Sequence, residues 1–175
     1  AEQAEQNERS QCNFIEYFQK TAVQRHKRSS QSIIVNWNRV CELLKLFAEG
    51  NSILFSQINL KLIEDFRQFL ITAPCSGNKK GTVSQNTAAT YFSIFKAALK
   101  QAFVDGYLTI DLSAKVKGIQ ELESRREHLT VEELNTLAAT DCDRPILKRA
   151  ALFSALTGLR HCDIQKLRWS EVQKD

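Results

Sequence analysis

The chain has 175 residues, of which 43% are hydrophobic and 25% charged, and this balance argues against an intrinsically disordered protein. A formal net charge of +4 suits a polyanionic partner without requiring one. No apolar run approaches the roughly 20 residues of a membrane span, and the N-terminus lacks the apolar core of a secretion signal. We therefore expect a cytoplasmic protein with no membrane partner.

The first half of the chain predicts two helices. Residues 1–11 are polar and are expected to be a frayed linker or the tail of an upstream helix. Apolar residues recur at helical spacing over 13–25 and again over 32–48, where Gly50-Asn51 provides a C-terminal stop.

Two further helices are expected before residue 107. Residues 53–58 form a short connector that could be extended, and Asn59 is the predicted N-cap of the third helix. Residues 73–81 contain Pro, Ser, Asn and two Gly, which indicates a loop. The fourth helix, 83–104, is predicted to begin with the capping box Thr82-x-x-Gln85 and to end at Asp105-Gly106.

The remainder of the chain is predicted as a basic inter-domain linker (108–127) followed by short helices. Thr130-x-x-Glu133 is a capping box, Pro145 suits the first turn of the next helix, and Gly158 separates that helix from another over 161–168. Residues 128–175 are too few to bury an adequate core. The sequence thus predicts an all-α protein with a helical domain at 10–107, the linker, and an incomplete second domain at 128–175.

The fourth helix carries the first candidate site. Its polar face contains no acidic residue, and small side chains alternate with longer ones. Small residues allow close approach to a groove, Asn can pair with a base edge, and Thr, Ser and Lys can bind phosphates. The candidate DNA contacts on this face are Asn86, Thr87, Thr90, Ser93, Lys96 and Lys100. The alternative is an ordinary solvated helix face.

Cations outside this helix form weaker candidates. Arg28 ends a basic cluster, and Lys79 and Lys80 lie on the 73–81 loop. Lys115 and Lys117 lie in the linker, where they could follow a phosphate backbone. Each cluster has a plain alternative: a charge at a helix C-terminus, a polar loop tip or a solvated linker.

No metal or cofactor site is predicted. The five cysteines contain no C-x-x-C pair, and the three histidines are at no ligand spacing from them. We expect these cysteines to be buried or half-buried free thiols in a reducing compartment.

The most specific motif is T-G-L-R-H-C-D-I-Q-K-L-R-W at 157–169. Gly158 allows a tight turn between helices, Arg160 begins the second helix, and Asp163 can pair with it or cap the turn. Ile164 and Leu167 are expected to be buried, with Trp169 packed at the end. On these grounds alone, Arg160 could be a structural arginine tied to a neighbouring acid.

This motif resembles the first arginine motif of the tyrosine recombinase (phage integrase) family. The order of the preceding segments is also similar: a helical bundle ending in A-x-x-x-G-Y-L, a K-V-K-G-I linker, and H-L-T-x-E-E-L before the arginine. The resemblance extends from about residue 13 to the end and is greatest to integrases of conjugative transposons.

The resemblance implies a SAM-like four-helix core-binding bundle followed by the first helices of a truncated catalytic domain. Members of the family cleave and rejoin double-stranded DNA without a cofactor, through a 3′-phosphotyrosyl intermediate, and self-associate on DNA. Arg160 would be the first phosphate-binding arginine and Asp163 the supporting acid. The helices 32–48 and 83–104 would clamp one side of the duplex.

The chain departs from the family pattern at its end. The second arginine motif and the nucleophilic tyrosine are missing, and Asp111-Leu112 stands where many members have Asn-Pro. Since the chain begins at Ala1 and has no Met, we interpret it as part of a longer recombinase and expect it to be inactive alone. The alternatives are a non-enzymatic helical DNA-binding regulator and a helical protein-interaction module.

Overall fold

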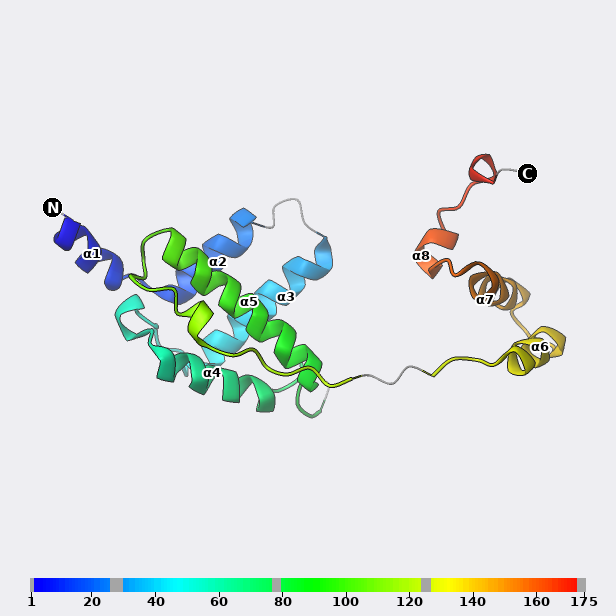
Figure 1. Cartoon of the computed structure of the whole chain (residues 1–175), viewed down its shortest axis with the longest axis horizontal. Coiled ribbons are helices and arrows are strands. Elements are labelled where there is room, and N and C mark those ends of the chain that lie inside the picture. The colour runs from blue at the N-terminus through cyan, green and yellow to red at the C-terminus, as the bar shows by residue number, and fades with distance from the viewer. Residues whose placement is uncertain (1, 26–29, 77–79, 124–126, 173–175) are drawn as a thin grey trace. The chain divides into compact units, whose positions relative to one another are not determined.

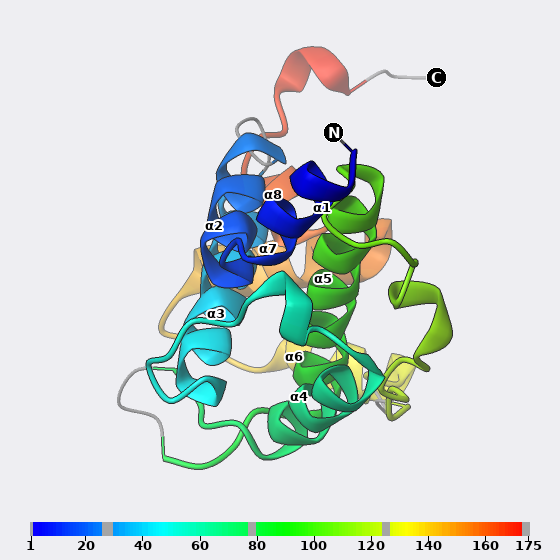
Figure 2. The ribbon, with the colours of Figure 1, turned by 90° about the vertical axis from the view of Figure 1, so that its left-hand side faces the viewer.

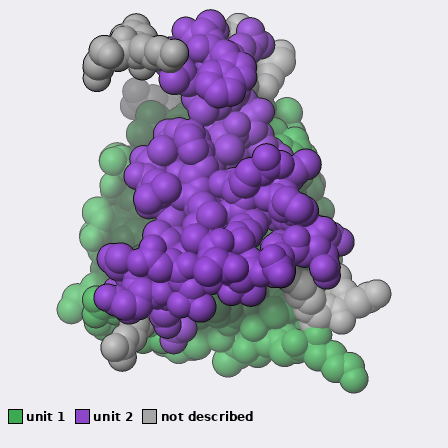
Figure 3. Space-filling model, turned by 90° about the vertical axis from the view of Figure 1, so that its right-hand side faces the viewer, with its two compact units in different colours: residues 1–123 green, residues 124–175 purple. Residues whose placement is uncertain are grey.

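The helical periodicity of the sequence appears as a chain of short and medium helices in the computed structural model (Figure 1). The structure describes residues 2–25, 30–76, 80–123 and 127–172. Within these ranges the regular secondary structure is entirely helical, as the all-α prediction requires. The chain forms two compact units, residues 1–123 and residues 124–175, which we call the first and the second unit (Figure 3).

The first unit contains five α-helices and two short 3₁₀ helices in its described part. The α-helices are α1 (Glu2–Ser10), α2 (Phe14–Arg25), α3 (Gln31–Phe47), α4 (Leu60–Thr72) and α5 (Gln85–Val104). The 3₁₀ helices are η1 (Phe55–Gln57) and η2 (Ser113–Lys115). The α5 helix is the longest of the described helices and packs against α3, α4 and η2 (Figure 2).

Aromatic side chains form the centre of the first unit. The Phe95 ring on α5 lies 5.8 Å from Phe14 of α2 and 4.7 Å from Phe66 of α4, measured between ring centroids. Phe14 also meets Phe55 of η1 edge-on at 5.5 Å. Because each ring contacts a different helix, burial of these apolar surfaces joins α2, α4, η1 and α5 into one core.

Local capping chemistry fixes several boundaries as predicted. The side chain of Asn59 accepts a hydrogen bond from the backbone N–H of Leu62 and caps α4. The α5 helix ends at Asp105, and Gly106 follows with a φ of 77°, a conformation that glycine adopts without strain. The helices predicted over 13–25 and 32–48 are confirmed to within one residue at each end.

The predicted start of the fourth helix was wrong. Its cap is Ser84, whose hydroxyl accepts from the backbone N–H of Thr87, and not Thr82. The reason is a short antiparallel pairing in which the N–H of Val83 donates to Ala73 O and the N–H of Cys75 donates to Gly81 O. This pairing holds residues 82–83 in extended backbone, so the helix begins two residues later.

The N-terminal residues, expected to be a frayed linker or the tail of a helix, are helical. They form α1, which is held to the turn after α5 by Arg9. The Arg9 guanidinium donates to Asp105 O at 3.2 Å and lies 6.0 Å from the centre of the Tyr107 ring. A Cβ at Gly106 would come within 2.5 Å of Arg9 Nη1, so the end of this side chain would have to shift, whereas the φ of 77° itself favours glycine.

Tyr17 strengthens the same junction. Its hydroxyl donates to Asp105 Oδ2 at 2.6 Å, across 88 residues of sequence. Burial, followed by this hydrogen bond, raises the pKa of Tyr17 well above its ordinary value. The neutral phenol is therefore the form that the folded protein favours.

We expect the Tyr17→Phe variant to lose less stability than the wild type in alkaline solution. In the unfolded chain Tyr17 ionises near its ordinary pKa of about 10, whereas in the folded protein it stays neutral. The stabilisation that Tyr17 gives the folded protein is therefore complete at pH values below about 10 and decreases as the pH rises above that value. Urea unfolding of both proteins, from neutral pH to beyond about 10, measures this; two curves with the same pH dependence contradict it.

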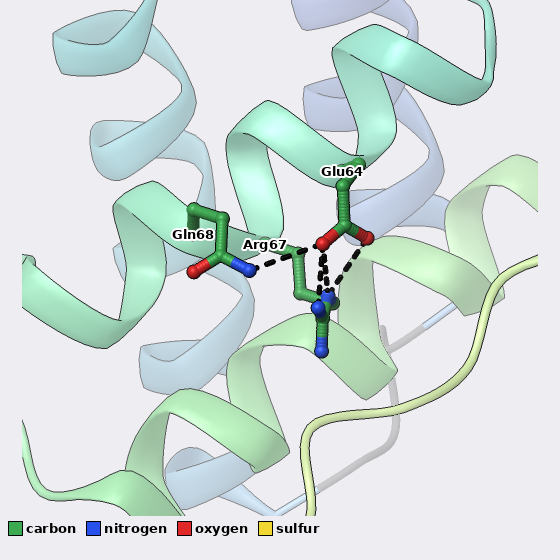
Figure 4. Close-up of polar contacts among 3 residues, drawn as sticks. All are labelled: Glu64, Arg67 and Gln68. Carbon is green, nitrogen blue, oxygen red and sulfur yellow. Dashed lines mark hydrogen bonds and ion pairs between the residues drawn. The ribbon is translucent and has the colours of Figure 1, made fainter.

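Charges on α4 are balanced within the helix itself. Figure 4 shows Arg67 donating to both carboxylate oxygens of Glu64, at 3.0 and 2.8 Å from Nε, while Gln68 donates to the same carboxylate at 3.1 Å. The Arg67 hydrogen bonds lower the pKa of Glu64. The α4 surface thus carries one acid–base pair of its own, whereas α5 carries no acidic residue.

The second unit is a chain of short helices. They are α6 (Val131–Ala139), α7 (Pro145–Thr157), α8 (His161–Ile164) and η3 (Trp169–Glu171). Thr130 and Glu133 form the predicted capping box, at 3.2 and 2.9 Å, and Pro145 occupies the first turn of α7.

None of the second unit's residues within 127–172 is buried. The predicted burial of Ile164 and Leu167 and the predicted packing of Trp169 were therefore wrong, since Ile164 is only half-buried, Leu167 is 40% exposed and Trp169 is 90% exposed. The physical reason is that this unit has too little apolar surface on its own helices to enclose these side chains. Among the described helices of both units, none combines the length and the apolar character that crossing a membrane requires.

Candidate nucleic-acid interface

A polar groove lies between α3 and α5 near the start of α5. It has a volume of about 260 Å³ and is lined by Asn36 of α3 and by α5 residues Asn86, Thr87, Thr90 and Tyr91. Its lining contains amides, hydroxyls and one aromatic ring but no carboxylate. Amides and hydroxyls are the groups that bind phosphate oxygens and base edges, although in this structure Asn86 donates to Leu122 O and Thr90 to Asn86 O.

The α5 sequence explains why this face is open to a polyanion. Residues 85–104 contain no Asp or Glu, so no acidic side chain offsets the positive end of the helix dipole in the N-terminal turn, although the Ser84 hydroxyl caps one N–H there. Thr90 and Ser93 are exposed on the outer side of the helix, and Lys100 is exposed two turns further on. The pKa of Asp111 is lowered mainly by its hydrogen bond from the Ser113 hydroxyl and, to a smaller extent, by the charge of Lys100, so this cation has an acidic neighbour.

Asn86 and Lys96 occupy a different environment from the one that the sequence pattern implies. Both are half-buried, because the extended chain after η2 runs along this side of α5. The side chain of Asn86 is hydrogen-bonded to the backbone of Leu122, and Lys96 Nζ donates to Val116 O at 2.7 Å. The predicted polar face therefore has a covered strip, which includes Asn86 and Lys96, and an exposed strip, which consists of Thr90, Ser93 and Lys100.

The remaining candidate cations are dispersed. Lys80 is exposed on the loop before α5, and Lys117 is exposed on the chain after η2. Lys115 lines a separate groove together with residues of α1, η1 and the start of α4. Arg28 and Lys79 lie outside the described residues.

Arg160 and Asp163 lie at the start of α8 in the second unit. Gly158 ends α7 with a φ of 71°, and its N–H donates to Ser154 O at 2.8 Å, while the Ser154 hydroxyl donates to Leu159 O at 2.7 Å. These bonds fix the turn that presents Arg160 as the exposed N-cap of α8.

The two side chains form no ion pair with one another, although both belong to the described residues. What links them is a backbone hydrogen bond from the N–H of Asp163 to Arg160 O, at 2.9 Å. In this structure, then, the Arg160 guanidinium is not tied down by Asp163.

Two participants in the groove were not found from the sequence. Asn36 lies between Ile33 and Val40 at helical spacing, on the border of the apolar face of α3, where a neighbouring helix is expected. A polar residue at the border of an apolar helix face is the sequence feature that could have identified Asn36 as a member of the groove. Tyr91 is 9% exposed and belongs to the hydrophobic core, and it also borders the groove.

Among residues 2–25, 30–76, 80–123 and 127–172, no three His, Cys, Asp or Glu side chains are grouped as metal ligands would be. Cys12, Cys142 and Cys162 are exposed, contrary to the expectation of buried or half-buried thiols, whereas Cys41 is buried and Cys75 half-buried. Burial raises the pKa of the Cys41 thiol.

The helices that form the groove lie within a segment with known relatives. The family model of the phage integrase SAM-like domain matches residues 13–117, which is more than half of the chain and includes α2 to η2. The chain belongs to the phage integrase SAM-like domain family. No curated protein and no solved structure gives a match.

This membership associates the chain with DNA recombination and integration. It also accounts for the architecture of the first unit, because the matched segment contains α2, α3, α4 and α5 in one bundle. The polar groove lies within the matched segment, and its lining residues belong to α3 and α5. These are the two helices that the family resemblance predicts to contact DNA.

Proposed function

We propose that the chain is the DNA-binding part of a tyrosine recombinase, of the type found in conjugative transposons, and that it binds double-stranded DNA for site-specific recombination. The observation that carries this proposal is the acid-free polar groove between α3 and α5 within the matched SAM-like domain. Thr87 and Thr90 would contact the DNA backbone or the base edges, and Ser93, Lys80 and Lys100 would bind phosphates.

The second unit supports the enzymatic part of the proposal. Arg160 is exposed at a fixed turn and free of an Asp163 ion pair in the described structure, so its guanidinium is available for a phosphate. In a recombinase that also contains the second arginine and the tyrosine, it would stabilise the charge that develops on the scissile phosphate. Asp163 would support the site, and the full-length protein would self-associate on DNA.

A salt titration with duplex DNA tests the binding. We expect affinity to fall as salt rises, with a log–log slope of about −0.9 for each phosphate contact. An undetectable affinity at low salt would instead favour a helical protein-interaction module.

A matched pair of variants locates the binding face. Ser93→Glu places an acid on the exposed strip of α5, whereas Ser52→Glu makes the same change on the exposed loop beyond the end of α3. We expect Ser93→Glu to weaken binding at low salt by about tenfold, because one charge is added where phosphates approach. Ser52→Glu should change it by less than about twofold. Equal effects of the two variants contradict the assignment of this face.

A further inference from the structure

The extended residues 116–122, which we call the strap, are held along α5. Lys96 Nζ donates to Val116 O at 2.7 Å, and Gln85 Nε2 donates to Gln120 O at 2.7 Å. The strap therefore runs from the middle of α5 back towards its N-terminus (Figure 1). Sequence patterns assigned these residues to a linker, but the boundary between the compact units falls after residue 123.

Asn86 makes the most specific contact with the strap. Its Nδ2 donates to Leu122 O at 2.9 Å, and its Oδ1 accepts from the Leu122 N–H at 2.8 Å. One amide side chain thus satisfies both backbone groups of a single residue, as a neighbouring β-strand would. Because Leu122 engages one N–H and one oxygen lone pair of this amide together, Asn86 cannot at the same time use that pair for a bidentate contact with an adenine.

Apolar burial adds to these polar contacts. Ile119 of the strap is 8% exposed and belongs to the core of the first unit. Ala89 lies between Asn86 and Lys96 on the same side of α5 and is 4% exposed. A small side chain at this position leaves room for a chain to lie close to the helix.

The position of the strap affects how the second unit is connected. While Leu122 is held on α5, the tether between the first unit and the Thr130 cap of α6 consists of residues 123–129. If the strap were released, the tether would consist of residues 116–129 and would be about twice as long. The effective concentration of one tethered unit near the other falls roughly with the 3/2 power of tether length, or about threefold for a doubling.

We propose that the strap is a latch, and that Asn86 and Lys96 are positioning residues that hold it rather than DNA contacts. The latch fixes the point at which the chain leaves the first unit, beside the α3–α5 groove that Asn86 also lines. The effect of the latch on DNA affinity rests on the proposed function, because it requires both units to bind one duplex. The docking of the strap on α5 is independent of the proposed function.

Hydrogen exchange of the whole chain tests the latch directly. In the wild type the Leu122 amide should exchange slowly, and Asn86→Ala should accelerate exchange within 116–122 by about tenfold through the loss of two hydrogen bonds. Ser93→Ala on the same helix is the matched control and should leave exchange unchanged. Lys96→Met, which keeps a long apolar stem, should accelerate exchange at the Val116 end. If both strap variants exchange like the control, the latch is overturned.

A DNA-binding comparison separates the latch from the proposed function. The latch predicts that Asn86→Ala weakens binding about threefold and equally for all duplex sequences. A sequence-dependent loss means that Asn86 contacts bases, and faster strap exchange on adding DNA to the wild type means that DNA displaces the strap; either result overturns the latch. If the wild type binds no duplex while exchange responds as expected, the proposed function fails and the docked strap remains.

Discussion

Replacing Phe95 with alanine is expected to lower the free energy of unfolding of the first unit by about 3–5 kcal/mol. Phe95 is completely buried, and its ring lies between those of Phe14, Phe66 and Phe92. The cavity left by its removal borders three helices at once, so no single helix can move to fill it. Against the 5–15 kcal/mol typical of a whole domain, such a loss leaves the unit marginally stable.

The two tryptophans make this loss measurable in the intact chain. Trp37 is 4% exposed and lies 5.0 Å from the Phe18 ring, whereas Trp169 of the second unit is 90% exposed. Fluorescence during urea unfolding therefore reports mainly on the first unit. Phe103→Ala is the matched control, because Phe103 lies on the same helix but is 40% exposed. Its expected loss is about 1–2 kcal/mol, since more than half of its surface is buried but it leaves no enclosed cavity, and equal losses for the two variants would contradict the described core.

Arg160→Ala is expected to slow strand cleavage by about 10²-fold in a recombinase that contains this chain and the remaining catalytic residues. A guanidinium directed at a scissile phosphate acts mostly in the transition state, so its removal affects the rate more than DNA affinity. Folding should be little affected, because the Arg160 side chain is exposed.

Cleavage of a suicide substrate, measured beside thermal melts, tests this assignment. Arg149→Ala, which removes an exposed arginine from α7 in the same unit, is the control and should cleave at the wild-type rate. A structural role for Arg160 predicts the opposite pattern, with a lowered melting temperature and a nearly normal rate. A normal rate in well-folded Arg160→Ala protein would remove the catalytic assignment.

Local chemistry explains which parts of the fold were predictable. Asn59, Thr130 and Gly158 act on backbone groups within four residues of themselves, so their sequence context predicts the helix boundaries correctly. The apolar periodicity of α2 and α3 is likewise a property of neighbouring turns. The all-α class and the SAM-like bundle follow from these signals together with the family resemblance.

What could not be predicted depends on partners distant in sequence. Arg9 docks α1 on a turn 96 residues away, and no pattern within residues 1–11 reveals that turn. Asn86 appeared to be a free polar residue because its partner, Leu122, lies 36 residues further along the chain. The sequence pattern predicts Asn86 and Lys96 as DNA contacts, but it does not reveal the strap that covers them.

The junction between α2 and the end of α5 also constrains how the protein is made. Tyr17 cannot form its hydrogen bond until Asp105, 88 residues later, has been synthesised, and Phe14 cannot pack against Phe95 until that residue has been synthesised. At ribosomal speeds this delay is on the order of ten seconds. During that interval α3 and η1 can pack against α2, but the part of its apolar face that contacts α5 has no partner. A nascent chain of this protein should therefore be a substrate for ribosome-associated chaperones until α5 has emerged from the exit tunnel.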